Sequence, residues 1–343
     1  MNCVAIVLGM SESCYLRHAS DFIPNIEEFQ FSIGNEKVNQ SDTTFEDTEE
    51  IDQILDVPLV VSIGGVLLPI FKKSKSRNEL NLVPVPSTRQ NLRNLAFAVS
   101  SNKCVCLQGA VGSGKTALIE FLAQATGHDA ENFAKVQLGD QTDSKMLLGM
   151  YRCTDIPGEF LWQPGILTEA VLSGKWLLLE DIDCAAADVI SVIGQLVATK
   201  TLSVPGYRDL IHVKSGFQLF VTRRLTFAGT QKSFQMPVQK QWFCVNVESL
   251  SKKELVTIVQ VLFPVLHTVA TRIVDVYLLF SAGDHEDDTI NHVRNSRQIS
   301  TRDLIKWCSR AIVDFDVSSP VSALKIFQDA LDVFCCSVSN SGM

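Results

Sequence analysis

The sequence lacks the long apolar runs of a membrane protein. No uninterrupted apolar stretch reaches the roughly 18 residues that a membrane-spanning helix needs. The apolar segment 255–270 is interrupted by Pro264 and His267, so it predicts core helices around a break. The stretch 1–10 is apolar but lacks the basic region that opens a signal peptide. We therefore expect no membrane partner.

The chain also lacks an excess of basic residues. It has 30 Lys and Arg against 38 Asp and Glu in 343 residues, so its net charge is −8. Proteins that bind the nucleic-acid backbone need a basic surface. The sequence therefore predicts no direct nucleic-acid binding. The short basic segment 72–77 is interpreted as a solvated linker rather than a nuclear-localisation signal.

The ten cysteines lack the spacing of a metal site. They occur singly or as the pairs Cys104/Cys106 and Cys335/Cys336, without two CxxC pairs. This pattern predicts no structural zinc site. We interpret the cysteines as reduced, mostly buried thiols of an intracellular protein.

The first 87 residues show little regular pattern. Residues 38–56 are polar and acidic with few large apolar side chains, which is typical of an exposed or disordered segment. Residues 57–71 alternate toward strand, and residues 72–87 form a linker with two prolines. We therefore assign residues 1–87 to a poorly ordered N-terminal segment and linker.

From residue 88 onward the pattern becomes regular. Apolar strands alternate with helical periods as far as residue 248, which indicates a parallel sheet covered by helices on both faces. The expected strands are 104–109, 134–140, 175–181, 216–223 and 242–248. Only helical periods remain after residue 249. The sequence thus predicts an α/β unit over residues 88–248 and an all-helical unit over residues 249–343.

The segment "GAVGSGKT", residues 109–116, fits the phosphate-loop pattern G-x-x-x-x-G-K-[ST] between an expected strand and helix. Gly112 and Gly114 allow the backbone to turn its amides toward phosphate. Lys115 is expected to reach the β- and γ-phosphates, and the Thr116 hydroxyl to reach Mg²⁺. The expected nucleotide contacts are Gly109, Ala110, Val111, Gly112, Ser113, Gly114, Lys115, Thr116 and Ala117. We therefore predict binding of a nucleoside triphosphate with Mg²⁺.

A second motif, "WLLLEDID", carries carboxylates at the end of an expected buried strand. Four apolar residues, 176–179, run directly into Glu180, Asp181, Ile182 and Asp183. Beside a phosphate loop, such a strand end completes a magnesium site. The alternative interpretation is an acidic helix N-terminus that follows a core strand.

Residues 135–183, together with the phosphate loop, closely resemble the first AAA+ module of the midasin family. Members of this family are dynein-related ATPases of large-ribosomal-subunit assembly. The arrangement QxGxLTxAxxxGxWxLLEDID over residues 163–183 is typical of the MoxR/midasin branch. The segments 216–225 and 300–310 follow in the expected order. The resemblance covers roughly residues 88–335 and implies an AAA+ α/β subdomain followed by a helical lid subdomain. The long N-terminal domain of the family is missing, so we expect a fragment, a truncated product or a shortened relative.

The resemblance also assigns roles to the two strand-end acids. In the family an Asp organises magnesium and the next Glu polarises the attacking water. Here Glu180 stands first and Asp181 second. Asp181 is one methylene shorter than the usual base, and a misplacement of about an ångström can lose on the order of 100-fold in rate. In an alternative register Asp181 is the metal residue, and Asp183 lies on the other side of the strand.

Three further positions are compared with the family pattern. Arg224 lies near the place of a polar residue that positions the lytic water, although it is also compatible with a surface basic pair with Arg223. Trp242 stands where the arginine finger that serves a neighbouring module is expected. Arg302 matches the lid arginine that touches the γ-phosphate, and the alternative is a surface residue at a helix start. Ser300 and Thr301 are a plausible cap, which puts Arg302 in the first turn.

Together these features predict an ATP-binding module of a midasin-like ATPase with slow or absent hydrolysis at this site. The resemblance implies a role in assembly and nuclear export of the pre-60S ribosomal subunit, in the nucleolus and nucleoplasm. It implies pre-60S particles and neighbouring AAA+ modules as partners. The alternatives are a non-hydrolysing scaffold module, an inert truncated product, or a small-molecule kinase. The all-helical C-terminal unit argues against the kinase.

Overall fold

The computed structural model describes residues 59–71, 82–139, 141–153, 155–156, 158–204, 210–225, 239–281, 299–316 and 320–335. The chain divides into two units, residues 1–55 and 56–343, and every described residue belongs to the second. The acidic segment 38–56 and the basic segment 72–77, on which predictions were made, lie outside the described residues.

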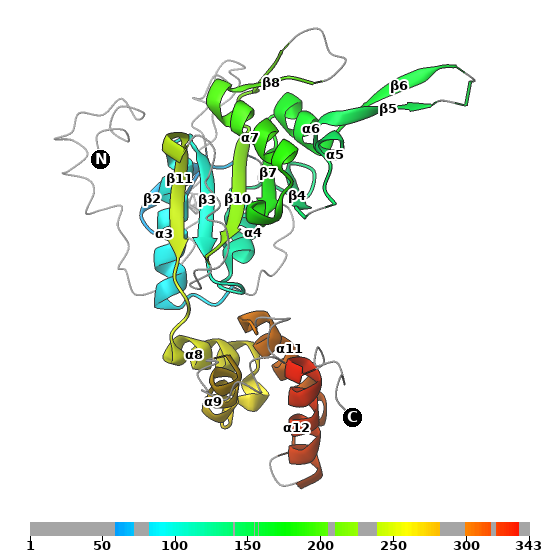
Figure 1. Ribbon diagram of the computed structural model, residues 1–343. Coiled ribbons are helices and arrows are strands. Elements are labelled where there is room, and N and C mark those ends of the chain that lie inside the picture. The colour runs from blue at the N-terminus through cyan, green and yellow to red at the C-terminus, as the bar shows by residue number, and fades with distance from the viewer. Residues whose placement is uncertain are drawn as a thin grey trace, which may run out of the picture. The chain divides into compact units, whose positions relative to one another are not determined.

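Within the described residues, five strands form one parallel sheet with the order β11-β3-β10-β7-β4 (Figure 1). The predicted parallel α/β architecture is therefore confirmed. The strands are β3 (Cys104–Gly109), β4 (Phe133–Gln137), β7 (Trp176–Glu180), β10 (Gln218–Arg224) and β11 (Trp242–Val247). In a parallel sheet all carboxyl ends meet at one edge, so the phosphate loop after β3 and the acids after β7 share that edge.

Each face of the sheet has its own apolar core. Side chains alternate along β7: Leu177 and Leu179 pack on one face, whereas Trp176 and Leu178 pack on the other. Because both faces are covered, β7 reads as a continuous apolar run rather than an alternating one. The covering helices are α3 (Pro86–Ser100) and α4 (Lys115–Ala125) on the Trp176 face, and α5 (Ser144–Leu148), α6 (Ile166–Ser173) and α7 (Ala187–Thr199) on the Leu177 face.

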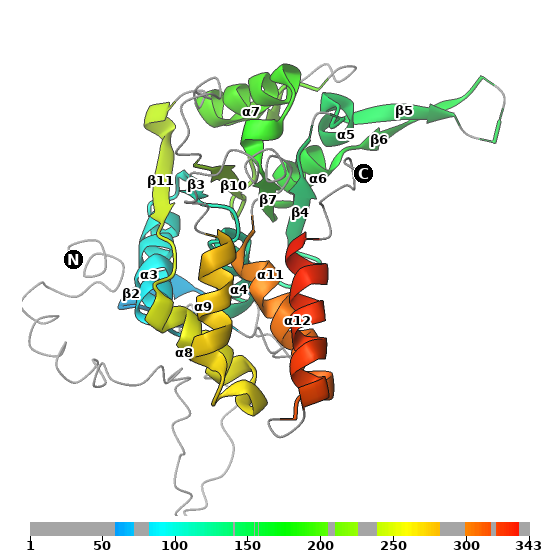
Figure 2. The same cartoon turned by 60° about the horizontal axis from the view of Figure 1, so that its bottom comes forward.

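The part of the chain that the structure describes also contains three antiparallel hairpins. They are β1 (Val60–Ile63) with β2 (Val66–Pro69), β5 (Gly149–Cys153) with β6 (Phe160–Pro164), and β8 (Thr201–Leu202) with β9 (Ile211–His212). The first agrees with the strand pattern expected over residues 57–71. The β5–β6 hairpin, which extends away from α5 and α6 in both views, was not expected (Figures 1 and 2).

The C-terminal part forms the expected all-helical unit, seen together in Figure 2. Its helices are α8 (Lys252–Leu262), α9 (Ala270–Ser281), α11 (Thr301–Ala311) and α12 (Pro320–Cys335). They share a core that includes Val259, Val274, Leu304 and Trp307. The predicted break at Pro264 is confirmed, because a short 3₁₀ turn at Pro264–Leu266 separates α8 from α9. None of the helices within the described ranges combines the length and apolarity that crossing a membrane requires.

Candidate nucleotide-binding site

The phosphate loop connects the end of β3 to the start of α4. Gly112 has φ +72° and Gly114 has φ +86°, a left-handed conformation that side chains other than glycine rarely adopt. Gly114 is also the N-cap of α4, whose first turn holds Lys115, Thr116 and Ala117. The backbone amides of this first turn are therefore available to an anion, whereas the amide of Ser113 donates to the carbonyl oxygen of Ala110 at 3.3 Å.

Two polar side chains of the loop are buried at this point. Lys115 is only 8% exposed, and its Nζ donates to the carbonyl oxygens of Gly109 (3.0 Å) and Ala110 (2.7 Å). Burial lowers the pKa of Lys115, and the charges of Asp181 and Asp183 oppose that shift. The buried Oγ of Ser113 has no hydrogen-bond partner among the described residues. An ammonium group and an unsatisfied hydroxyl beside the first-turn amides of α4 form a donor set that fits a phosphate chain.

Two side chains expected to bind magnesium, Thr116 and Glu180, contact each other although they come from distant segments of the sequence. Thr116 Oγ1 donates a hydrogen bond to Glu180 Oε1 across 64 residues of sequence. The described residues contain no cluster of three His, Cys, Asp or Glu side chains that could hold a metal ion alone. Mg²⁺ usually keeps several waters and uses one or two protein oxygens together with the substrate phosphates. Thr116 and Glu180 fit that requirement.

Asp181 stands in a different environment from Glu180. It follows the last residue of β7 with φ +54°, and its N–H donates to Thr222 Oγ1 at 2.9 Å. Its Oδ2 accepts from Gln137 Nε2 at 2.8 Å, and its Oδ1 lies 3.8 Å from Arg224 Nε. Both carboxylate oxygens therefore have partners on the neighbouring strands β4 and β10. Gln137 and Thr222 had not been predicted as site residues.

Asp183 lies beside Arg224. The alternative register placed Asp183 beyond Ile182 on the other side of the strand, but Arg224 Nε donates to Asp183 Oδ2 at 3.1 Å and Arg224 N donates to Oδ1 at 3.2 Å. That placement is wrong because residues two apart in a strand project to the same face. In the structure β7 ends at Glu180, a 3₁₀ turn follows at Ile182–Cys184, and Asp183 lies with Asp181 beside the same arginine.

Arg224, the last residue of β10, has its charge compensated. Besides its contacts with Asp181 and Asp183, it donates to the sulfur of Cys184. Burial lowers the pKa of Arg224, but the nearby Asp183, Cys184 and Asp181 outweigh this, and the net shift is upward. The guanidinium thus lies where a water-positioning residue was expected, and it is ion-paired with two carboxylates.

The start of α11 lies against the phosphate loop. A Cβ added at Gly112 would clash with the Cβ of Ser300 and lie 3.1 Å from Thr301 N. Ser300 is the N-cap, and its N–H and hydroxyl each donate to Asp303 Oδ2 at 2.9 Å. Arg302 lies in the first turn, as expected, and is exposed. The charge of Arg302 reaches Lys135 on β4. The pKa of Lys135 is raised chiefly by its hydrogen bond to Glu120, and burial and the charge of Arg302 oppose this rise.

Trp242, at the expected arginine-finger position, is a core residue. It is 5% exposed, opens β11 and pairs with Cys104. Its place in the sheet explains why an apolar side chain stands there.

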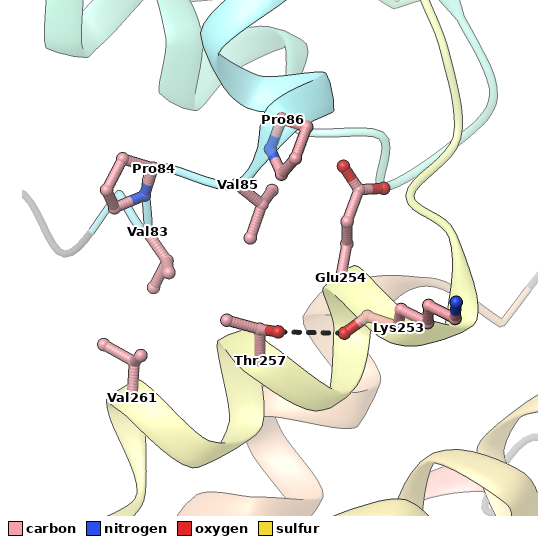
Figure 3. A pocket seen from close by; sticks show the side chains of 8 residues that line it. All are labelled: Val83, Pro84, Val85, Pro86, Lys253, Glu254, Thr257 and Val261. Atoms are coloured by element: carbon pink, nitrogen blue, oxygen red, sulfur yellow. Dashed lines mark hydrogen bonds between the residues drawn. The ribbon is translucent and has the colours of Figure 1, made fainter. Parts of the chain in front are cut away.

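A groove of about 510 Å³ lies between the segment before α3 and helix α8 (Figure 3). Beside it, Glu254 Oε1 accepts from the N–H of Ser87 at 2.7 Å. Burial would raise the pKa of Glu254, but the hydrogen bonds from Ser87 and Ser251 lower it to about 2. The groove is lined by Val83, Pro84, Val85, Pro86, Lys253, Glu254, Thr257 and Val261. None of these is an expected phosphate or magnesium contact.

Comparison with known proteins gives two family matches. Residues 104–240 match the AAA domain of the dynein-related subfamily, and residues 254–342 match the midasin AAA lid domain. Midasin of Dictyostelium discoideum is 34% identical over 308 residues, which cover 76% of this chain and 5% of that protein. Midasin of Giardia intestinalis is 36% identical over 121 residues, or 35% of this chain and 2% of that protein.

A bacterial protein is also similar. The uncharacterized protein YojN of Bacillus subtilis is 26% identical over 137 residues, which cover 39% of this chain and 44% of that protein. The chain thus spans a small part of the midasins that it matches. It carries an AAA domain and a midasin-type lid in the order seen in the fold, and it belongs to the midasin branch of the dynein-related AAA+ proteins.

Proposed function

We propose that this chain is an ATP-binding AAA+ module of a midasin-like ATPase whose own site hydrolyses ATP slowly or not at all. The observation that carries this proposal is the contrast between two neighbouring acids. Glu180 contacts Thr116 at the phosphate loop, whereas both oxygens of Asp181 face Gln137 and Arg224.

ATP binding rests on the loop and on the first turn of α4. The backbone amides of the loop and of the first turn would bind the phosphates, and Lys115 and the amide of Ser113 would exchange their carbonyl acceptors for phosphate oxygens. Bound Mg²⁺ would offset the phosphate charge, and Thr116 and Glu180 would hold it. Arg302 would approach the γ-phosphate from the lid.

Slow hydrolysis is proposed because Asp181 is poorly suited to act as the general base. A general base must reach the attacking water within about 3 Å. Asp181 is shorter than glutamate, and its carboxylate already accepts from Gln137 while lying close to Arg224. A non-hydrolysing scaffold module is the second candidate, and the same contacts favour it.

Residues 1–87 would be the N-terminal segment, residues 88–248 the nucleotide-binding subdomain and residues 249–343 the lid. By resemblance to midasins, the chain would act in the assembly and nuclear export of the pre-60S ribosomal subunit. Its partners would be pre-60S particles and neighbouring AAA+ modules, and it would work in the nucleolus and nucleoplasm. The matching proteins named midasin support this placement.

The test is to measure ATP binding and phosphate release by the purified full chain, with and without Mg²⁺. We expect saturable, Mg²⁺-dependent binding of ATP and phosphate release no faster than that of the Asp181→Asn variant. Robust release that Asp181→Asn abolishes would show that the reversed acids support hydrolysis. Absence of ATP binding would refute the whole assignment.

A further inference from the structure

Two cysteine thiols face each other across neighbouring strands of the sheet. Cys106 on β3 and Cys244 on β11 are in-register partners. Parallel neighbours lie about 4.8 Å apart, which is within the roughly 4.4–6.8 Å between Cα atoms that a disulfide spans. In-register side chains of adjacent strands project to the same face, so the two sulfur atoms lie on one side of the sheet.

The two thiols differ in exposure and in charge. Cys106 is fully buried, whereas Cys244 on the edge strand is exposed. A hydrogen bond from Cys106 lowers the pKa of Cys244 to about 6, and the nearby charge of Arg223 acts in the same direction. The same hydrogen bond, together with burial, raises the pKa of Cys106. Cys244 is therefore the thiol that ionises more readily, and Cys106 is the neighbour that donates to it.

We propose that Cys106 and Cys244 form a peroxide-sensitive dithiol that closes into a disulfide between β3 and β11. The Cys244 thiolate attacks hydrogen peroxide, breaks its O–O bond and becomes a sulfenic acid with release of hydroxide. The Cys106 sulfur, as it loses its proton, attacks the sulfenic sulfur and displaces its oxygen as water. Two thiols are oxidised to one disulfide, and one peroxide is reduced to two waters.

The position of the pair gives the bond a structural consequence. β3 leads into the phosphate loop, and β11 leads into the helical unit. A disulfide would covalently join these two strands, 138 residues apart in sequence, three residues before each reaches the in-register pair Gly109 and Val247. Oxidation would therefore lock the strand that carries the loop to the strand that carries the lid.

The test uses the full chain, reduced and then freed of reductant. After treatment with hydrogen peroxide and alkylation of remaining thiols, it is digested with trypsin without reduction. We expect a linked pair of peptides 104–115 and 241–252 that dithiothreitol separates. Fragment ions must assign the bond to Cys106, because Cys104 lies on the same peptide. This measurement on the unchanged chain requires no substitution at a buried position.

Matched variants complete the experiment. Cys244→Ser should abolish the linked pair, whereas Cys153→Ser, which removes an exposed thiol on β5, should leave its yield unchanged. Three results would overturn the proposal: oxidation of Cys244 to sulfinic acid without linkage, linkage of Cys244 to a cysteine other than Cys106, or oxidation of Cys153 while Cys244 stays reduced.

Discussion

Two groups of residues at the same sheet edge differ in what their side chains contact. The phosphate-binding half comprises residues 109–116 and Glu180, and its polar groups contact one another around the loop. The hydrolytic edge comprises Asp181, Asp183 and Arg224, and its charges compensate each other. If the proposed function holds, the comparison shows how nucleotide binding and hydrolysis would depend on different residues of one sheet edge. The first needs a preserved loop, whereas the second needs a free base of the right length.

The largest effect is expected from removing the positive charge of Lys115 in the phosphate loop. Lys115→Ala should weaken ATP binding by about 100-fold or more, because the phosphates lose a buried, charge-assisted donor. Isothermal titration calorimetry with Mg²⁺-ATP measures this. Lys145→Ala, which removes an exposed lysine from α5, is the control and should bind ATP normally. Equal affinity of the Lys115→Ala and Lys145→Ala variants would contradict the assignment of the loop.

A second pair of substitutions tests whether Glu180 or Asp181 is the Mg²⁺ ligand. Glu180→Gln should remove most of the Mg²⁺-dependent gain in ATP affinity, a loss of roughly 10-fold, because the ion loses an anionic ligand. Asp181→Asn should keep that gain. Titrations with Mg²⁺ and with EDTA give the gain for each variant. The opposite pattern would make Asp181 the metal residue.

Lowering the pH is expected to destabilise the protein at the start of β7, the strand whose other end carries Glu180 and Asp181. His128 stacks on Trp176, the first residue of β7, with ring centroids 3.9 Å apart, and burial lowers its pKa to about 4 from 6.5. The folded state therefore holds His128 neutral, and between pH 6.5 and 4 the unfolded chain binds more protons. The stabilisation is complete above pH 6.5 and decreases as the pH falls toward 4.

We expect the free energy of unfolding to fall by roughly 1–2 kcal/mol between pH 7 and pH 5 from this group, since His128 is only partly buried. Urea unfolding at the two pH values measures the change. His128→Phe should reduce the pH dependence, and His212→Gln, a substitution of an exposed histidine on β9, should preserve it. A pH dependence unchanged by His128→Phe would contradict the account.

The smallest expected effect concerns the hydrolytic edge itself. Arg224→Asn should raise the rate of ATP cleavage by about 10-fold or less, because it releases Asp181 and Asp183 and restores a polar group beside the water. Single-turnover formation of ADP measures the rate. Arg223→Asn, at the preceding residue, is the matched control and should leave it unchanged. A slower Arg224→Asn variant would show that the arginine assists cleavage.

The sequence predicted the layered fold and singled out the residues of the loop because both depend on local patterns. The alternation of strands and helices, the phosphate loop and the break at Pro264 can be read from neighbouring residues. The hydrolytic edge depends on strand order and on where β7 ends. Asp183 was misplaced because the alternative register set it on the other side of the strand, although residues two apart in a strand share a face. Gln137 and Thr222 contact Asp181 only because β4 and β10 flank β7.

The measurement that tests the central claim most directly is single-turnover hydrolysis by the wild-type chain and by the double variant Glu180→Asp/Asp181→Glu. The account predicts that the wild type keeps its bound ATP intact, and that the variant, with a longer base beyond a shorter metal ligand, forms ADP at least about 10-fold faster. Both proteins should bind ATP with similar affinity. Rapid formation of ADP by the wild type, slowed by the exchange of the two acids, would contradict it.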